Sequence, residues 1–219
     1  MSHILCIETA TTNCSVSVCN NGKLLALVED NGKNYSHAER LHTSIQEVLQ
    51  QANLNKSQLC AIAVSKGPGS YTGLRIGVSA AKGLCYALDL PLIALPTLHV
   101  LAQQVSQETD FIIPMLDARR MEVYAAVFDA NYNSIRETQA EILSETSYSN
   151  YLDQGKVAFI GNGVEKFAAV CQHPNAIFMA DKLPSAREMC TPATEKFLQN
   201  DFENLAYFEP FYLKDFMMK

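Results

Sequence analysis

The sequence predicts an α/β protein built of two units, and three observations lead to this prediction. Three strand patterns open the chain, after which helix and strand patterns alternate over the first hundred residues. The dipeptide Asn21-Gly22, a strong hairpin signal, joins the second and third strands as antiparallel neighbours. A second series of strand and helix patterns starts near Thr109. Since interleaved strands and helices are typical of mixed α/β layers, we expect one unit over residues 1–107 and a smaller one over 108–219.

Each element of the first unit follows from its pattern of apolar residues. The strand predictions rest on short apolar or alternating runs. The first helix has a cap at Ser36 and apolar residues at helical spacing, and Thr97 caps the third helix. The expected order is strands over 3–10, 14–19 and 23–28, a helix over 36–51, a strand over 60–64, a helix over 74–88, a strand over 91–95 and a helix over 97–105.

The second unit begins with a predicted hairpin around the charged turn Asp117–Arg120. A solvated turn explains the charges of Asp117, Arg119, Arg120 and Glu122, and a contact with a partner is the alternative interpretation. The last helix is expected to begin at Pro184, because proline suits the first turn of a helix. The expected order is strands over 111–116 and 122–128, a helix over 144–152, a strand over 157–160, helices over 164–171 and 184–199, and a closing strand over 209–214.

The composition is that of a folded protein, since 48% of the 219 residues are hydrophobic and 18% are charged. The formal net charge of −6 does not indicate a chain that wraps nucleic acid by itself, and no run of Lys or Arg marks a local basic patch. The opening residues lack the basic segment of a signal peptide, and Glu8 interrupts their apolar run. No stretch approaches the ~20 apolar residues of a membrane span. We therefore expect a soluble, cytoplasmic protein that does not contact a membrane.

The cysteines indicate neither a metal site nor a disulfide framework. Their number is odd, none of them forms a Cys-x-x-Cys pair, and most lie in apolar strand or helix patterns. Buried free thiols in a reducing compartment fit this arrangement better. The seven residues are Cys6, Cys14, Cys19, Cys60, Cys85, Cys171 and Cys190.

The most distinctive stretch is the glycine block, Lys66–Gly77, between a predicted strand and a predicted helix. A strand that runs through glycines into a helix N-terminus is the usual way to present backbone N–H groups to an anion. However, Gly73 is followed by Leu74 instead of the lysine of a Walker loop. Glycines 67, 69 and 73 also have the wrong spacing for a dinucleotide loop. Pro68 and Thr72 stand where a nucleophile elbow needs glycines.

Two interpretations of the glycine block remain. It is either a rigid connection from strand to helix or a loop that binds an anion. For the first, Pro68 fixes its φ angle and the glycines permit positive φ. Ser70 or Thr72 then caps the helix that follows.

A stripe of small residues runs along that helix, since Gly73, Gly77, Ala81 and Cys85 recur every four residues. Glycine inside a helix costs up to ~1 kcal/mol relative to alanine, so Gly77 and Gly83 need a packing reason, and the smooth stripe lets a packing partner approach closely. This partner is either the chain's own first helix or sheet, or a second protein. For a second protein, the predicted two-helix docking face consists of Leu41, Ile45, Val48, Leu49, Gly73, Leu74, Gly77, Val78, Ala81, Leu84 and Cys85.

Several segments together resemble the TsaB family, also called YeaZ. The resemblance covers essentially the whole chain and is strongest over residues 1–125. The glycine block is its most specific motif. The matching segments are Ile7–Thr11, His37–Leu41, Gly67–Gly77, Ala81–Leu84, Asp117–Tyr124 and Pro210–Lys214.

The resemblance implies an actin-like, Hsp70-like ATPase (ASKHA) fold with two related subdomains. It also implies a role in forming threonylcarbamoyladenosine beside the anticodon of bacterial tRNAs. In that system TsaD transfers the threonylcarbamoyl group, TsaE is an ATPase, and TsaB is the non-catalytic member. We therefore expect TsaD and TsaE as partners, a homodimer when the chain is alone, and tRNA contact only within the complex. The two-helix face corresponds to the homodimer or TsaD contact of the family.

The same resemblance allows a search for catalytic residues. Proteins of the TsaD type hold a metal with a His-x-x-x-His pair, whereas Leu41 stands at that spacing from His37. The next histidine, His42, points about 140° away on a helix. We therefore expect neither a metal nor a catalytic residue, and we interpret both histidines as surface or interface polarity.

A weak nucleotide site is the remaining expectation from the resemblance. Actin-like ATPases place a carboxylate and small hydroxyl residues of the first strand and turn near metal and phosphate. Glu8 stands where relatives commonly have aspartate, and its extra length suits magnesium poorly; an ion-paired or capping role is the alternative. Gly161-Asn-Gly163 is either a turn before a helix or a close approach to the nucleotide. The predicted loop for weak ATP or ADP binding consists of Glu8, Thr9, Thr11, Gly67, Gly69, Ser70 and Thr72.

Three classes of function follow from these observations. The first is a non-catalytic scaffold that binds TsaD and supports tRNA modification. The second is an ATP-dependent kinase or ATPase of the actin-like fold. The third is a metalloprotease, a label that this superfamily has carried, and the missing ligand spacing argues against it.

Overall fold

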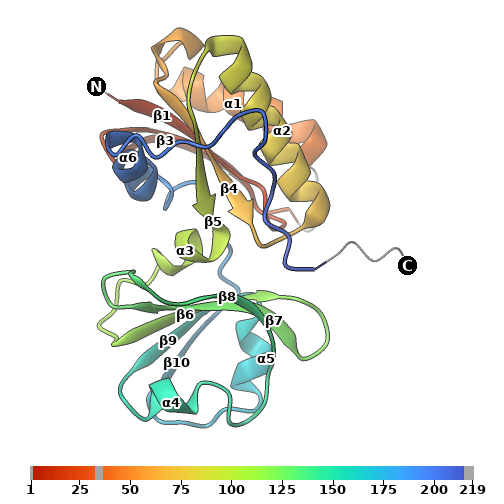
Figure 1. The fold of residues 1–219 in the computed structure, drawn as a ribbon, viewed down its shortest axis with the longest axis vertical. Helices are drawn as coiled ribbons and strands as arrows, with labels where there is room; N and C mark the ends of the chain where they lie inside the picture. Colours follow the sequence, from red (N-terminus) through yellow and green to blue (C-terminus); the bar gives the residue numbers. More distant parts are fainter. Residues whose placement is uncertain (1, 33–36, 215–219) are drawn as a thin grey trace. The chain divides into compact units, whose positions relative to one another are not determined.

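The computed structural model describes residues 2–32 and 37–214, and the chain divides into two compact units (Figure 1). The first unit is formed by Met1–Val100 together with Pro184–Lys219, and the second by Leu101–Leu183. The boundary between them lies within helix α3 (Thr97–Ala102). Each unit is built around one five-stranded sheet.

The first sheet has the strand order β3-β2-β1-β4-β5. β2 is antiparallel to both of its neighbours, whereas β4 is parallel to both of its own. Asn21 and Gly22 have positive φ angles of 49° and 79°, which confirms the predicted hairpin turn. The strands are β1 (His3–Glu8), β2 (Cys14–Asn20), β3 (Lys23–Asp30), β4 (Ala61–Gly67) and β5 (Leu92–Pro96), and the short 3₁₀ helix η1 (Lys56–Gln58) precedes β4.

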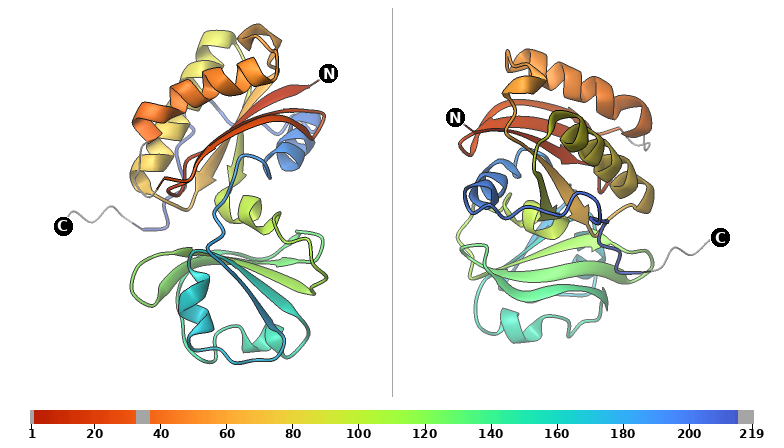
Figure 2. Two further views of the ribbon diagram at one scale, coloured as in Figure 1. Left: turned by 180° about the vertical axis from the view of Figure 1, so that it is seen from behind. Right: turned by 45° about the horizontal axis from the view of Figure 1, so that its top comes forward.

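Helices cover both faces of this sheet, because successive side chains of a strand point to opposite faces. α1 (His37–Gln51) and α2 (Tyr71–Leu88) pack against the face that carries Leu5 and Ile7. α6 (Cys190–Leu198) packs against the opposite face, as Figure 2 shows from behind. The apolar layers on the two sides of the sheet are the core of the first unit.

The second sheet repeats the topology of the first. Its order is β10-β9-β6-β7-β8, in which β7 is antiparallel to its two neighbours and β9 is parallel to its own. Two copies of this arrangement form the actin-like ATPase fold, so the predicted fold class with two related subdomains is confirmed. The elements are β6 (Phe111–Asp117), β7 (Glu122–Asp129), β8 (Ser134–Ile142), α4 (Ser149–Leu152), β9 (Val157–Gly161), α5 (Val164–Ala168) and β10 (Ala176–Ala180).

The predicted boundary at residue 107 needs a correction for the C-terminal part of the chain. Residues 184–219 belong to the first unit and not to the second. The physical reason is burial: Met189 and Ala193 are fully covered against the first sheet. The Glu203 amide also donates to the Leu92 carbonyl at 2.9 Å. The chain therefore returns to its starting unit to complete the core.

Three further details differ from the expectation, and one prediction stays untested. The predicted closing strand over 209–214 has no strand structure, and α6 begins at Cys190 instead of Pro184. The edge strands β8 and β10 were not predicted, and their residues lie half-exposed or exposed without a continuous apolar run. The predicted cap Ser36 lies outside the described residues.

The burial of the cysteines agrees with the expectation. All seven lie within the described residues, none of them forms a disulfide, and all but Cys60 are buried. Among the described helices, none combines the length and the apolar character that crossing a bilayer requires.

Candidate functional site

The glycine block forms the turn between β4 and α2. Ser70 is the N-cap of α2, and its Oγ accepts a hydrogen bond from the Gly73 amide at 3.2 Å. The Leu74 amide donates to the Ser70 carbonyl at 2.9 Å. Of the two predicted caps, Ser70 is therefore confirmed, whereas Thr72 lies exposed in the first turn of the helix.

This turn packs directly on the turn that follows β1. The Ser70 amide donates to the Ala10 carbonyl at 2.7 Å, and the Thr9 hydroxyl donates to the Gly73 carbonyl at 2.8 Å. The Gly67 amide donates to Thr97 Oγ1 at 3.1 Å. Residues of the predicted anion loop are thus brought together. However, the amides of residues 67, 70, 73 and 74 donate their hydrogen bonds to oxygen atoms of the protein. The contacts favour a rigid connection over an anion cradle.

The glycines are explained by these close approaches. A Cβ atom at Gly69 would overlap Ala10, and a Cβ atom at Gly73 would overlap the Thr9 carbonyl. A Cβ atom at Gly77 would overlap Thr9 Oγ1. The stripe of small residues on α2 therefore packs against the chain's own first sheet and turn.

This packing corrects the predicted docking face. Ten of its eleven residues are buried in this chain, and the other, Leu84, is partly buried against the same core. A side chain enclosed by its own fold cannot contact a partner, because helical apolar spacing marks the inner face of a surface helix first. The buried ten are Leu41, Ile45, Val48, Leu49, Gly73, Leu74, Gly77, Val78, Ala81 and Cys85.

The outer face of α2 has small residues as well. Ser79, Gly83 and Ala87 are exposed, and Ile76 and Ala80 are half-exposed. A Cβ atom at Gly83 would have no neighbour within 4 Å. Among the described residues, no contact requires glycine at this helical position.

Glu8 ends β1 and is fully buried. Its Oε1 accepts hydrogen bonds from the Ala10 amide at 2.6 Å and the Ser65 hydroxyl at 2.8 Å. Its Oε2 is buried without a hydrogen-bond partner among the described residues. Burial raises the pKa of Glu8 to about 7, and the two hydrogen bonds oppose that rise. Of the predicted alternatives, the contacts favour a capping residue at a strand end.

The other residues of the first turn are also enclosed. Thr9 is fully buried and Thr11 nearly so. Thr11 Oγ1 accepts a hydrogen bond from the Asn13 amide at 3.3 Å. The Thr11 carbonyl lies 2.7 Å from His37 Nε2. The hydroxyls of this turn therefore serve the fold, and both point to partners inside the chain.

His37 was expected at the surface or in an interface, and this expectation is wrong. The side chain is only 1% exposed, and burial lowers its pKa. The ring connects the start of α1 to the first turn through the Thr11 carbonyl. His42 is exposed as expected. In the described parts of the chain, no three His, Cys, Asp or Glu side chains are grouped so that they could hold a metal ion.

In the second unit, the charged turn after β6 is exposed at Asp117, Arg119 and Arg120. Lys166 forms an ion pair with Asp117 at 2.6 Å and also donates to the Glu122 carbonyl at 3.1 Å. Gly161 has a φ of 127°, and Asn162 Oδ1 accepts a hydrogen bond from the Asp117 amide at 3.0 Å. These interactions favour the interpretation of both segments as turns.

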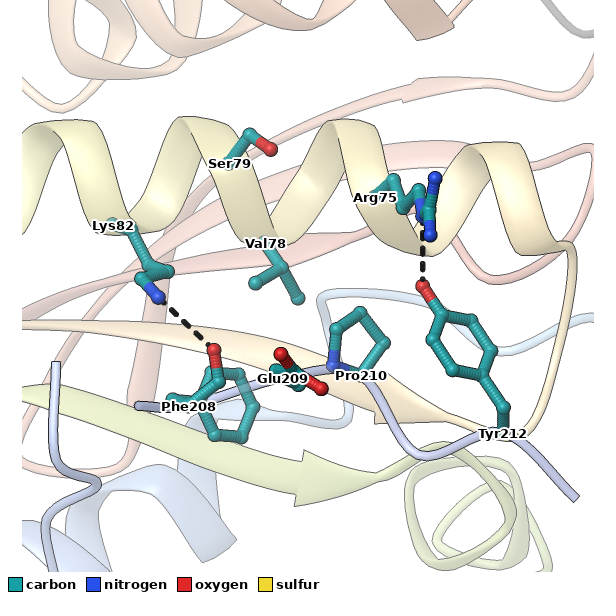
Figure 3. Close-up of a pocket in the computed structure, with 8 residues that line it drawn as sticks. All are labelled: Arg75, Val78, Ser79, Lys82, Phe208, Glu209, Pro210 and Tyr212. Atoms are coloured by element: carbon teal, nitrogen blue, oxygen red, sulfur yellow. Dashed lines mark hydrogen bonds between the residues drawn. The ribbon is translucent and has the colours of Figure 1, made fainter. Parts of the chain in front are cut away.

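A surface pocket of about 240 Å³ lies between α2 and the C-terminal segment (Figure 3). α2 contributes Arg75, Val78, Ser79 and Lys82 to its wall. The opposite wall is formed by residues 208–210 and Tyr212. The sequence had not predicted this contact, because the matching motif of residues 210–214 has the apolar pattern of a strand.

The cap at Ser70 provides a first test of this local structure. Ser70→Ala is expected to lower the free energy of unfolding by about 1 kcal/mol, because the Gly73 amide loses its acceptor. Thr72→Ala is the matched control, since Thr72 is exposed in the same turn. Urea unfolding measures both variants. An equal effect of the two substitutions would contradict the cap.

Comparisons with known proteins agree with the resemblance. A family model described as "TsaD: tRNA N6-adenosine threonylcarbamoyltransferase" matches residues 33–219. The chain is 29% identical to the tRNA threonylcarbamoyladenosine biosynthesis protein TsaB of Escherichia coli, over 97% of this chain and 94% of that protein. The protein of the same name from Haemophilus influenzae is also 29% identical, over 97% and 93%.

Solved structures show the same relationship. YeaZ from Pseudomonas aeruginosa superposes with a TM-score of 0.81 at 26% identity, covering 97% of this chain and 100% of that one. A second structure from this organism, described as an uncharacterized protein with similarity to peptidase YeaZ, has a TM-score of 0.83 at 25% identity and covers 98% and 100%. From the matched family model and these relatives of nearly equal length, the chain belongs to the TsaB (YeaZ) family.

Proposed function

We propose that this chain acts in the formation of threonylcarbamoyladenosine in tRNA, as a non-catalytic subunit that binds a TsaD-type transferase. Its relatives from Escherichia coli and Haemophilus influenzae are named for this biosynthesis. TsaE and tRNA join only in the complex with the transferase. When the transferase is absent, two copies of the chain pair through the face that otherwise binds the transferase, the outer face of α2.

The non-catalytic role is supported by the hydrogen bonds that the first turn and the glycine block form within the chain. The amides of Gly67, Ser70 and Gly73 donate to oxygens of Thr97, Ala10 and Ser70, respectively. Glu8 is enclosed and bonded to its own neighbours. These contacts do not favour the alternative of a kinase or ATPase. Calorimetric titration with ATP and magnesium tests this point, and micromolar binding that Glu8→Gln abolishes would favour the ATPase.

The single observation that carries the docking proposal is Gly83. It lies inside an 18-residue helix, is exposed, and has open space where a Cβ atom would stand. A glycine costs roughly 1 kcal/mol relative to alanine there, and no contact with the described part of the chain offsets that cost. Together with Ala80 and Ala87, it leaves a smooth outer surface on α2 that another helix can approach closely.

Gly83→Gln is expected to weaken binding of the TsaD-type transferase about tenfold or more, because the added side chain separates two closely packed helices. The matched control is Glu195→Gln, which places an exposed glutamine on α6, across the sheet from α2. Calorimetry or biolayer interferometry measures both dissociation constants. Equal affinities for the variant, the control and the original chain would overturn the assignment of this face.

A further inference from the structure

The C-terminal segment Ala206–Tyr212, here called the strap, is attached to α2 at one end by a lysine. Lys82 Nζ donates to the Ala206 carbonyl at 3.3 Å and to the Phe208 carbonyl at 3.0 Å. Phe208 also packs against the core between α2 and the sheet. In Figure 3 the lysine side chain reaches down from α2 to this end of the strap.

At its other end the strap is attached to the start of α2 and to the glycine block. Arg75 Nε donates to the Tyr212 hydroxyl at 3.3 Å, and the Tyr212 ring lies 4.8 Å from the Tyr71 ring. The Arg75 guanidinium stands 4.1 Å over the Tyr71 ring, a cation–π contact. The Phe211 amide donates to the Lys66 carbonyl at 2.7 Å. Two motifs that lie far apart in the sequence are thus in direct contact.

Between these two attachments, residues 208–210 of the strap line the pocket opposite α2. Among the described residues, neither Arg75 nor Lys82 forms an ion pair with a carboxylate within 4.0 Å. Both cations instead donate hydrogen bonds to carbonyl or hydroxyl oxygens of the strap. Such charge-assisted hydrogen bonds are among the stronger ones. Two cations two helical turns apart therefore hold one irregular segment.

The inner face of α2 explains why such a segment matters. Gly73 and Gly77 carry no side chain that could interlock with the turn at Thr9, so along this part of α2 the interlocking contacts are left to buried neighbours such as Leu74 and Val78. Close packing of smooth surfaces resists separation, but it resists rotation about the helix axis less well than interlocking side chains do. The strap acts on the side of the helix, at Arg75 and Lys82, and supplies this constraint.

We propose that the strap is a positioning element for partner docking, with Tyr212 as its key residue. By holding α2 at Arg75 and at Lys82, it fixes the orientation in which Gly83 and its neighbours face the transferase. In this role Tyr212 acts by positioning α2 and not by contacting the transferase. This inference rests on the proposed function above.

Tyr212→Ala is expected to weaken binding of the TsaD-type transferase about tenfold, a typical size for coupling through an intermediate element. At saturating concentrations of the variant, threonylcarbamoyl transfer is expected to reach the original rate. Tyr212→Phe keeps the ring against Tyr71 but loses the Arg75 hydrogen bond, so its affinity is expected to fall between those of Tyr212→Ala and the original chain. Tyr207→Ala is the matched control, since this ring of the strap is 84% exposed.

Hydrogen exchange of the free chain separates positioning from a direct contact. Tyr212→Ala is expected to accelerate exchange of the amides in 71–82 and to leave α1 and α6 unchanged, whereas Tyr207→Ala changes neither. Unaltered exchange in α2, or unaltered affinity of Tyr212→Ala, would overturn the positioning role. If the original chain itself does not bind the transferase, the proposed function fails, and the exchange result still decides whether the strap restrains α2.

Discussion

Replacing Gly73 with alanine is expected to lower the free energy of unfolding by about 3 kcal/mol, the upper range for overpacking a tight site. The new Cβ atom would overlap the Thr9 carbonyl oxygen. This oxygen belongs to the backbone of the turn after β1, so it cannot move aside as a flexible side chain does. The Thr9 hydroxyl, which donates to the Gly73 carbonyl at 2.8 Å, would be displaced as well.

The same substitution at Gly83 is expected to have the opposite sign. Because a Cβ atom there meets nothing within 4 Å, alanine gains helix propensity without a clash. Gly83→Ala should raise the free energy of unfolding by roughly 0.5–1 kcal/mol. Urea unfolding of the free chain measures both variants of this one helix. Destabilisation by both, or by neither, would contradict the two packing environments assigned to the inner and outer faces of α2.

The second large effect concerns pH and Glu8. Burial raises its pKa from 4.5 to about 7 in the folded chain. The folded state therefore holds this proton more tightly than the unfolded state does. The resulting stabilisation is complete below pH 4.5 and is lost as the pH rises through about 7. The loss amounts to roughly 3 kcal/mol, from 1.36 kcal/mol for each pKa unit.

Glu8→Gln is expected to remove this part of the pH dependence, because the amide resembles the protonated acid in shape and charge. The variant should be more stable than the original chain at pH 8 and nearly equal to it at pH 4.5. Glu188, whose pKa burial also raises to about 7, still contributes a loss of its own. Unfolding in urea between pH 4.5 and 8 gives both profiles, with the exposed Glu39→Gln as the control. Parallel profiles would contradict a buried, proton-binding Glu8.

The first hundred residues could be predicted well from the sequence because local signals agree with the tertiary structure there. Asn21-Gly22 dictates a hairpin, and Ser70 caps the helix that it was expected to cap. The second unit was predicted less completely. β8 is a polar edge strand containing Arg136 and Glu141, which pair with each other at 2.7 Å, so it lacks a continuous apolar run. The return of α6 to the first sheet depends on contacts distant in the sequence.

The candidate site was predicted in its location but not in its orientation. The apolar positions of α1 and the small stripe of α2 were taken for a docking face, yet residues such as Leu41 and Gly77 are buried against the chain's own sheet. Periodicity identifies the buried face of a helix, whereas a partner contacts the face that remains. The sequence shows Gly83 as a helical glycine that needs a packing reason. Its exposure in the structure indicates that the packing partner lies outside this chain. The strap was not predictable, because its contacts are irregular and long-range.

As a non-catalytic subunit, this chain is expected to be indispensable to a TsaD-type transferase. The most direct measurement is threonylcarbamoyl transfer to tRNA, with the transferase, TsaE, ATP and threonylcarbamoyl-adenylate supplied, in the presence and absence of this chain. We predict modification only when both the transferase and this chain are present, none by the chain alone, and a reduced yield with Gly83→Gln at limiting concentration. Full modification without the chain, or modification by the chain without the transferase, would contradict the account.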